Sequence, residues 1–296
     1  MQPRERRIRT ERSSWALSRS DTVLSMVLLA EVFAELFRRH QKLGAHVVGG
    51  FSPHIAPLGF SRSNLVIRDG ECLSTSGSIS DSEMSLVFGI CEIVKPKRVL
   101  VIGNSYGLST AFFALANPQA EVVAFDKYRV KGLEFTRELC AGLCVTAIEA
   151  STPEDLTKVV GDHLGGEVDL VFVDAVHEND VQTAEFRILA PLLSEGGTVV
   201  FHDVLSSNLL DSFSLLKHEF PSFAFRVLAK SHSGLGVATR FESELLADYL
   251  TYFESSPSAV SRSERMFGSE LVDGLARLMG VGDLGATYRT RPHPQT

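Results

Sequence analysis

The stretch Arg98-Val-Leu-Val-Ile-Gly-Asn-Ser-Tyr-Gly-Leu-Ser-Thr110 decides the fold of this chain. An apolar run rich in β-branched residues ends at Gly103, and a helical pattern begins at about Leu108. This order predicts a strand, a tight turn and a helix, which together point backbone N–H groups and a helix N-terminus at a ligand. Gly103 permits a sharp turn and the close approach of a ligand, and Gly107 lets the helix pack near the strand.

The spacing within this turn argues against a dinucleotide site. The G-x-G-x-x-G fingerprint would need glycines where Ser105 and Leu108 stand, so a dehydrogenase is the least favoured function. The remaining G-x-S-x-G is also the nucleophile elbow of α/β-hydrolases, with Ser105 as the nucleophile. That alternative is disfavoured because the elbow normally follows a later strand of its sheet.

Length, charge and cysteine content narrow the class of protein. The 296 residues, 44% of them hydrophobic, suit one large domain with appendages. A formal net charge of −7 argues against a nucleic-acid binder. No apolar run reaches the roughly 18–20 residues that span a bilayer. Four cysteines without a disulfide or metal spacing indicate reduced thiols, and hence a cytoplasmic protein.

The sequence divides into segments of different character. We expect a disordered basic tail, an N-terminal helix with a lid or oligomerisation segment, an α/β domain and a C-terminal helical extension, at residues 1–20, 21–79, 80–240 and 241–296. The first helix should run from Asp21 to Leu43 and end at Gly44. Apolar residues cover much of its circumference, which favours a homodimer. Residues 44–79 are rich in Gly, Ser and Pro and are expected to be irregular.

Strand and helix patterns alternate through the α/β domain. Strands are predicted at 98–102, 121–126, 145–148, 168–173, 196–201, 223–228 and 234–239. Helices are expected at 80–94, from about 108, at 130–140, from 151, and at 181–193, 208–218, 242–254 and 269–279. The pattern predicts a Rossmann-like, mostly parallel seven-stranded sheet with helices on both faces and a C-terminal antiparallel hairpin.

Polar residues stand where several of these strands end. Ligands of open α/β sheets bind beyond the carboxyl ends of the strands. Asp126 closes the second strand about twenty residues after the glycine turn, a position suited to binding the hydroxyls of a ribose. Asp174 and the pair His202-Asp203 close the fourth and fifth strands.

Taken in order, the motifs resemble those of a known family. They are V-L-V-I-G-N-S-Y-G-L-S-T at 99–110, A-F-D at 124–126, D-L-V-F-V-D-A-V-H at 169–177, L-L-S-E-G-G-T-V-V-F-H-D at 192–203 and G-L-G-V-A-T-R at 234–240. The region resembles class I S-adenosylmethionine-dependent methyltransferases, and among them the small-molecule O-methyltransferases. The resemblance implies S-adenosylmethionine as cofactor and a natural-product or sugar-type hydroxyl as acceptor.

The resemblance also implies which residues hold the cofactor. They are Gly103, Asn104, Ser105, Tyr106 and Gly107 at the methionine and ribose, Ser109 at the carboxylate, Asp126 and Lys127 at the ribose, Ala150 and Ser151 at the adenine, and Asp174. One departure concerns the end of the first strand. The family often has an acidic residue there, two positions before the first glycine, and this chain has Val101.

For the chemistry, Asp174, His177 and His202 are the expected catalytic residues. Methyl transfer is an in-line displacement, so the acceptor must be aligned and its hydroxyl proton removed. Either histidine suits a general base. Alternatively, Asp174 and Asp203 hold Mg²⁺, which lowers the pKa of the acceptor. Catechol-type members follow the second aspartate with Asn, whereas Val204 stands here. A non-catalytic protein of this fold that binds a ligand or partner is the alternative function.

Overall fold

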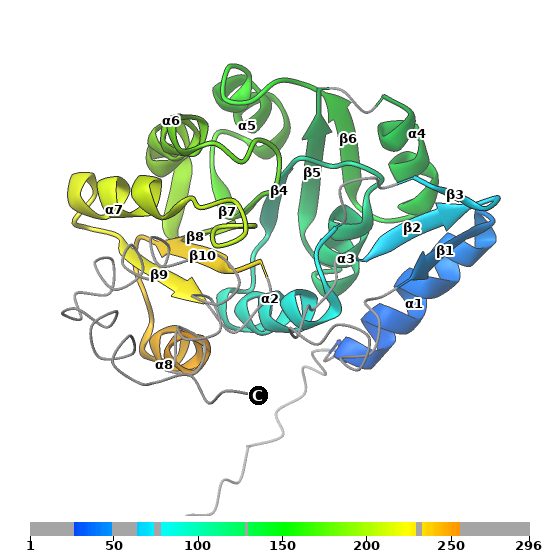
Figure 1. The fold of residues 1–296 in the computed structure, drawn as a ribbon, viewed down its shortest axis with the longest axis horizontal. Coiled ribbons are helices and arrows are strands. Elements are labelled where there is room, and N and C mark those ends of the chain that lie inside the picture. The colour runs from blue at the N-terminus through cyan, green and yellow to red at the C-terminus, as the bar shows by residue number, and fades with distance from the viewer. Residues whose placement is uncertain (1–26, 49–63, 74–77, 128–129, 229–232, 255–296) are drawn as a thin grey trace, which may run out of the picture.

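A central seven-stranded sheet with helices on both faces forms most of the molecule (Figure 1). The computed structural model describes residues 27–48, 64–73, 78–127, 130–228 and 233–254. The predicted tail at 1–20 and the predicted helix at 269–279 lie outside these residues. Within the described part, no helix has the length and apolar character needed to cross a membrane.

The sheet has the strand order β6-β5-β4-β7-β8-β10-β9. Its strands are β4 (Arg98–Ile102), β5 (Glu121–Asp126), β6 (Val145–Glu149), β7 (Val168–Val173), β8 (Leu193–Phe201), β9 (Ala224–Leu228) and β10 (Leu235–Thr239). Strand β10 pairs antiparallel with both β8 and β9, and the other pairings are parallel. The predicted fold class is confirmed. The chain extends the sheet in opposite directions from its centre, with β5 and β6 beyond β4 and with β8, β10 and β9 beyond β7. In open α/β sheets, ligands bind at the carboxyl ends of the two strands where this direction changes, here β4 and β7.

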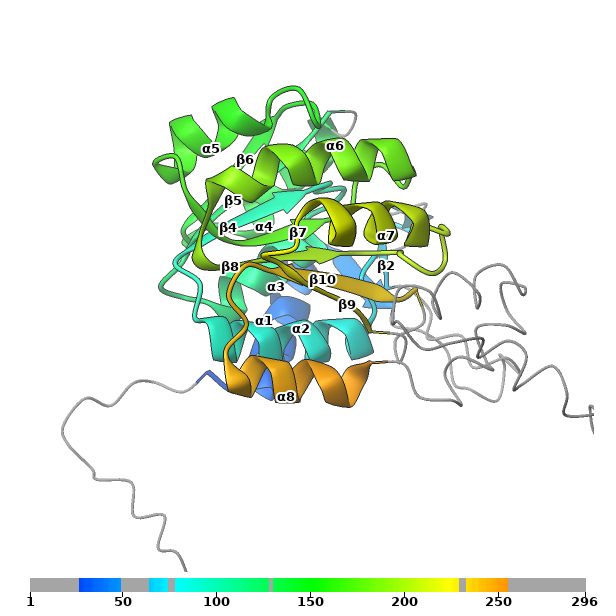
Figure 2. The same ribbon diagram turned by 90° about the vertical axis from the view of Figure 1, so that its left-hand side faces the viewer.

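Two layers of helices cover this sheet. They are α2 (Asp81–Val94), α3 (Leu108–Ala116), α4 (Val130–Leu139), α5 (Leu156–Leu164), α6 (Asn179–Leu189), α7 (Leu210–Glu219) and α8 (Glu244–Phe253), with α1 (Leu29–Lys42) before them. Figure 2 shows α5, α6 and α7 on one face and α2 and α8 on the other. Successive residues of β4 face opposite layers, since Leu100 belongs to one buried cluster and Val101 to the other.

The first helix begins later than predicted. Helix α1 starts at Leu29, while residues 27 and 28 precede it and residues 21–26 lie outside the description. The Glu31 side chain accepts a hydrogen bond from the Leu28 backbone N–H at 3.4 Å, which places the N-cap at Leu28 rather than Asp21. The predicted stop at Gly44 is confirmed, because this residue has a φ of 69° just after the helix.

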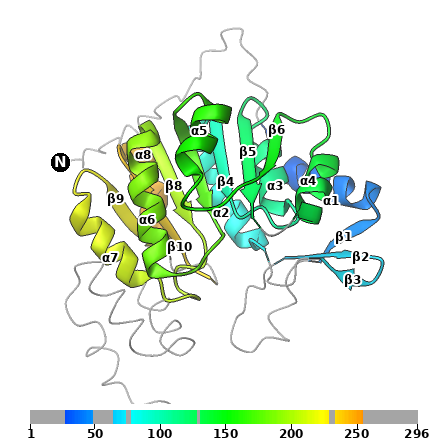
Figure 3. The ribbon, with the colours of Figure 1, turned by 90° about the horizontal axis from the view of Figure 1, so that it is seen from above.

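The expectation of an irregular segment at 44–79 is wrong in part. Strands β1 (Ala45–Val48), β2 (Leu65–Arg68) and β3 (Glu71–Cys72) form a small antiparallel sheet, which Figure 3 shows beside α1. Asp69 and Gly70 connect β2 to β3 and both have positive φ, 53° and 82°. An Asp-Gly pair between short apolar runs is a strong hairpin signal, and the composition of the segment obscured it.

Two further boundaries differ from the prediction. Helix α5 begins at Leu156 rather than 151, because the Asp155 carboxylate accepts the Ser151 N–H at 2.8 Å and residues 151–155 form turns. Helix α6 ends at Leu189 rather than 193, followed by a 3₁₀ turn (Ala190–Leu192). Pro191 lies in that turn and cannot continue an α-helix, so β8 already begins at Leu193.

Candidate active site

The glycine turn after β4 is shaped by close backbone approach. Gly103 has a φ of 90°, and a Cβ at this position would collide with the backbone carbonyl of Asp174 at the end of β7. The N–H groups of Gly103 and Asn104 both donate to the Phe125 carbonyl on β5, at 3.1 and 3.2 Å. The turn is therefore tied to the ends of both strands that flank β4.

The Asn104 side chain forms hydrogen bonds within the turn and with neighbouring helices. Its Nδ2 donates to the Ser105 carbonyl and to Thr136 Oγ1, each at 2.9 Å. Its Oδ1 accepts from Thr110 Oγ1 at 2.9 Å. Gly107 leaves room for this network, because a Cβ there would collide with Thr136. Asn104 is 1% exposed, so its amide stabilises the turn's shape.

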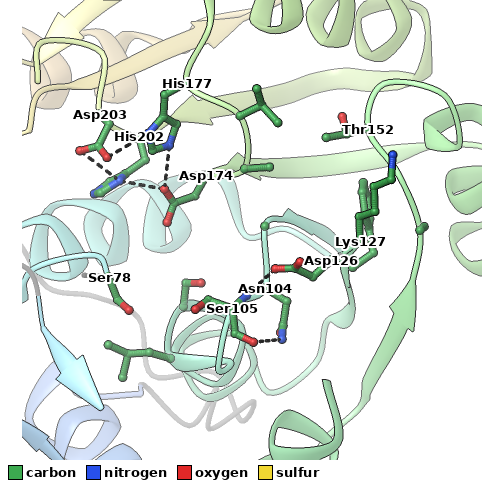
Figure 4. Close-up of a pocket in the computed structure, with 17 residues that line it drawn as sticks. Ser78, Asn104, Ser105, Asp126, Lys127, Thr152, Asp174, His177, His202 and Asp203 are labelled. Atoms are coloured by element: carbon green, nitrogen blue, oxygen red, sulfur yellow. Dashed lines mark hydrogen bonds and ion pairs between the residues drawn. The ribbon is translucent and has the colours of Figure 1, made fainter. Parts of the chain in front are cut away.

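A cavity of about 420 Å³ opens beside this turn (Figure 4). Among the predicted site residues, its lining includes Gly103, Asn104, Ser105, Ser109, Asp126, Lys127, Ala150, Asp174, His177, His202 and Asp203. The lining also includes residues that the sequence interpretation missed, namely Ser78, Leu108, Phe125, Thr152, Ala175 and Val176. The structure thus brings residues from five strand ends to one cavity.

Three predicted cofactor residues are not among those that line the cavity. The ring of Tyr106 packs edge-on against Phe135, with centroids 6.1 Å apart. Gly107 is buried at the start of α3. Ser151 is held by Asp155 in the turn before α5. Their predicted contacts with a cofactor stay predictions.

Ser105 and Asp126 form the polar wall at one end of the cavity. The Ser105 N–H donates to Asp126 Oδ2 at 2.9 Å, which fixes the carboxylate at the tip of β5. Ser105 has a φ of 46°, and its buried Oγ has no hydrogen-bond partner among the residues that the structure describes. A buried hydroxyl without a partner fits a polar ligand at this wall. Among the residues that the structure describes, no histidine hydrogen-bonds to this hydroxyl, so the described part of the chain supplies no catalytic base for the hydrolase alternative.

An acid–histidine cluster lies on the other side of the cavity (Figure 4). His202 Nδ1 is 3.0 Å from Asp174 Oδ1 and 3.5 Å from Asp203 Oδ1. His177 Nε2 is 3.4 Å from Asp174 Oδ1, and its Nδ1 is 3.4 Å from Asp203 Oδ2. Each imidazole therefore lies between the same two carboxylates.

His202 is the more enclosed of the two histidines. It is 5% exposed, and its Nε2 lies 3.2 Å from Glu83 Oε2 on α2. Burial alone lowers the pKa of His202, but the charges of Asp174 and Glu83 outweigh it and raise the pKa well above its ordinary value. Both ring nitrogens face carboxylates, so the charged imidazolium is the favoured form.

The carboxylates respond in the opposite direction. Burial alone would raise the pKa of Asp203, but hydrogen bonding to His202 and its charge hold the pKa at about 2. Burial also opposes ionisation of Asp174, and the charge of His202 brings the pKa of Asp174 below its ordinary value. The pKa of His177 is raised, first by its interaction with Asp174. The cluster is a compact arrangement of two carboxylates and two imidazoles.

The donor set of this cluster fits a divalent cation. One ligand atom from each of Asp174, His177 and Asp203 lies within 4.8 Å of the others. Val204 is 0% exposed in the apolar core, so it contributes no donor where catechol-type members have Asn. His177 lies 3.4 Å from Asp203 and would be the third donor for such a cation. Carboxylate and imidazole together suit several divalent metals.

Comparisons with known proteins agree with this geometry. Residues 100–204 match the model of a family described as a methyltransferase domain. Over 120 residues the chain is 33% identical to a catechol O-methyltransferase of Mycobacterium tuberculosis, an alignment that covers 38% of this chain and 50% of the relative. The chain thus spans half the length of the curated relative that it matches.

One solved structure shows the same fold. A structure described as a putative O-methyltransferase from Klebsiella pneumoniae superposes with a TM-score of 0.50 at 16% identity, covering 70% of this chain and 89% of that one. An O-methyltransferase from Bacillus cereus in complex with SAH has a TM-score of 0.49 at 18% identity, covering 56% and 84%.

The strand order and the glycine turn define the class I S-adenosylmethionine-dependent methyltransferase fold. The resemblance predicted from the sequence is confirmed, since residues 100–204 of this chain match the model of a methyltransferase domain.

Proposed function

We propose that this protein transfers the methyl group of S-adenosylmethionine to a hydroxyl of a small molecule. The observation that carries the proposal is the single cavity that joins the glycine turn and Asp126 to the acid–histidine cluster. A cofactor seated at the first would present its reactive methyl toward the second. Proximity and alignment are the main requirements of such an in-line transfer.

The cofactor end is supported by the chain's own polar groups. Asp126 is fixed by the Ser105 N–H and is suited to accept hydrogen bonds from ribose hydroxyls. The unpartnered Ser105 hydroxyl and the buried Ser109 line the same wall. We infer that these groups bind the ribose and methionine portions, while Ala150 and Thr152 flank the adenine.

His177 is the better general base of the two predicted candidates. Its side chain is 31% exposed, and its two carboxylate contacts of 3.4 Å are longer than typical hydrogen bonds. The ring can therefore turn toward an acceptor hydroxyl. His202 is enclosed between Glu83 and Asp174, so its proton is held by those carboxylates. We infer that His202 supplies a fixed positive charge that holds the two aspartates in place.

A divalent cation is the alternative means of activating the hydroxyl. Asp174, His177 and Asp203 would hold it. When bound, such a cation lowers the pKa of a coordinated hydroxyl and supplies positive charge near the reacting oxygen. Chelation separates the two alternatives, because only a metal-dependent enzyme loses activity in EDTA and regains it with Mg²⁺ or Mn²⁺.

The cellular environment, the oligomeric state and the acceptor are inferred from features outside the cavity. All four cysteines are free, which supports a reducing, cytoplasmic environment. On α1, Leu28 at its N-cap and Phe37 are 47% and 44% exposed, and these apolar side chains support a homodimer through this helix. A natural-product hydroxyl remains the expected acceptor, and a catechol is a suitable first probe because of the relative described above.

Calorimetric titration with S-adenosylmethionine and S-adenosylhomocysteine tests the cofactor site. We expect micromolar binding that Asp126→Ala weakens at least tenfold, since a buried ligand hydroxyl loses its acceptor. The matched control is Asp162→Ala on the exposed face of α5. Methyl transfer to catechol with labelled cofactor then tests the reaction. If the protein binds neither compound, the proposal is contradicted and a non-catalytic, partner-binding protein is favoured.

A further inference from the structure

Glu83 links the first turn of α2 to the acid–histidine cluster. It is the third residue of the helix, and its Oε2 accepts the Ser80 N–H at 3.0 Å and the Ser80 hydroxyl at 2.8 Å. The bond from the Ser80 N–H and the reciprocal bond from the Glu83 N–H to the Ser80 hydroxyl at 3.3 Å form a capping box, which explains why the sequence pattern alone identifies Glu83 as a structural residue. The side chain is nevertheless only 2% exposed, deeper than a cap requires.

The same carboxylate faces two side chains from distant parts of the chain. His202 Nε2 lies 3.2 Å from Glu83 Oε2, and Ser233 Oγ donates to Glu83 Oε1. Ser233 is itself anchored, because its carbonyl accepts the N–H groups of Leu205 and Ser206 at 2.9 and 3.0 Å. All these contacts lie in the interior of the protein, where a misplaced polar group is costly.

We propose that Glu83 is a positioning residue for His202, and that through His202 it fixes Asp174 and Asp203 for the reaction. The inference rests on the proposed function for its kinetic consequence, but not for its geometry. With Nε2 held by Glu83, the opposite ring nitrogen must face the two aspartates. A rotated ring would lose the contacts on both sides at once. Buried groups that orient a site in this way typically change activity by 10- to 100-fold.

The hydrogen-bond donors around Glu83 indicate which substitutions at this position can preserve its contacts. Four donors converge on its two oxygens, from the Ser80 N–H, the Ser80 hydroxyl, the Ser233 hydroxyl and His202. A carboxylate has about four acceptor sites, so this capacity is filled. In Glu83→Gln the remaining oxygen can still accept from His202 while the Ser233 hydroxyl turns to accept from the amide. In Glu83→Leu no acceptor remains.

The first test is a nuclear magnetic resonance spectrum of the imidazole N–H groups of nitrogen-15-labelled protein. We expect a slowly exchanging Nε2 proton of His202 in the unmodified chain, assigned by its loss in His202→Gln. Glu83→Leu should lose this resonance and Glu83→Gln should keep it. Absence of the resonance in the unmodified chain, or its persistence in Glu83→Leu, would overturn the proposal.

Should Glu83→Leu not fold, Ser233→Ala provides the second test. This variant removes one donor to Glu83, together with a hydroxyl 3.3 Å from His202 Nε2, and leaves the helix cap intact. Proton exchange at His202 Nε2 should then accelerate about tenfold, because the carboxylate that protects it is less restrained. An unchanged exchange rate would contradict the positioning role.

Kinetics with S-adenosylmethionine and the catechol probe give the functional consequence. Glu83→Leu should lower kcat at least tenfold while KM for the cofactor stays within about twofold, since the Asp126 end is untouched. Glu83→Gln should restore most of kcat. Glu92→Gln, a half-buried carboxylate near the other end of the same helix that pairs with Lys95, is the matched control. If the unmodified chain transfers no methyl group, the proposed function fails, whereas the imidazole resonance still decides the positioning role.

Discussion

The absence of a Cβ at Gly103 lets the ends of β4 and β7 approach each other beside the cavity. Its backbone adopts a φ of 90° and lies against the carbonyl of Asp174, so two strand ends meet without a side chain between them. The residue therefore combines a conformational requirement with a steric one. Both act at the boundary between the Asp126 wall and the acid–histidine cluster of the cavity.

We expect Gly103→Ala to destabilise the protein by about 2 kcal/mol or more and to abolish cofactor binding, because the strain and the collision add. The matched control is Gly161→Ala in α5, where a Cβ meets no atom within 4 Å. That helical substitution should stabilise the protein by about 0.5–1 kcal/mol. Urea denaturation measures both. Equal stability of the two variants would contradict the steric argument.

Glu185 on α6 is a second residue with a measurable consequence. It is 0% exposed, and Thr152 Oγ1 donates to its Oε1 at 2.5 Å. Within the described part of the chain, its Oε2 has no hydrogen-bond partner. Burial raises the pKa of Glu185 from 4.5 to about 7, against the opposing effect of Thr152. In the unfolded chain the group ionises near its ordinary value. Between pH 4.5 and about pH 7, the folded state therefore keeps a proton on Glu185 that the unfolded state has lost.

Stability should therefore fall as pH rises from about 4.5 to 7, by about 3 kcal/mol for this group. Glu185→Gln cannot ionise and should lack this loss. The difference in free energy of unfolding between Glu185→Gln and the unmodified chain should therefore shift in favour of the variant between pH 5 and pH 8. Denaturation of both proteins at each pH measures this difference. Glu154→Gln, an exposed carboxylate, is the control and should show no such trend. A parallel pH profile for Glu185→Gln would rule out this ionisation.

At the scale of elements, the contact between α2 and α8 depends on a glycine. A Cβ on Gly89 would collide with the Tyr249 hydroxyl, which donates to the Leu86 carbonyl at 2.8 Å. Tyr249 thus binds the backbone of α2 directly. Burial raises the pKa of this phenol to about 12, so it stays a hydrogen-bond donor at neutral pH.

Gly89→Ala should displace α8 from α2. Amide hydrogen exchange within α8 should accelerate at least tenfold, while exchange in β4 and β7 stays unchanged, because opening of a single helix is a local event. Tyr249→Phe, which removes the hydrogen bond but not the ring, should have a smaller effect, about 1 kcal/mol. Uniform acceleration throughout the sheet would show instead that α8 is part of the global folding unit.

The same elements show what could be predicted from the sequence. The strands around Gly103 were predictable because apolar, β-branched runs ended at glycine or aspartate, and helix α2 because Ser80 and Glu83 form a recognisable cap. The hairpin at Asp69-Gly70 carried a signal that the composition of its segment obscured. The helix boundary at Leu189 also carried a local signal, because Pro191 cannot continue an α-helix, and the prediction of a helix to 193 did not use it.

The candidate site was less predictable than the fold. Residues at strand ends, such as Asp126 and Asp174, follow from topology, since parallel strands end at one edge. The contact between Glu83 and His202 joins residues 119 positions apart and leaves no local pattern. Sequence also could not separate His177 from His202, because their difference in burial arises from packing of α2 against the sheet.

At the scale of the whole molecule, the proposed homodimer can be tested through α1. Phe37 is an exposed apolar side chain on this helix. We expect the unmodified chain to elute as a dimer in size-exclusion chromatography with light scattering, and Phe37→Glu to elute as a monomer, because a buried charge without a partner is unfavourable. Leu215→Glu on α7, where the apolar side chain is 49% exposed, should remain dimeric. A monomeric unmodified chain would contradict the proposal.

The strand order of the sheet also has a consequence for synthesis on the ribosome. Strand β9 leaves the ribosome before β10, yet β10 lies between β8 and β9 and is the partner of both. Until residue 239 has emerged, the outer edge of β8 stays unpaired and β9 has no correct neighbour. An open apolar edge is a hazard for aggregation, and domains mature from the N-terminus as they emerge. The final strand therefore closes the sheet, and a chain stalled before it would be a natural target for chaperones.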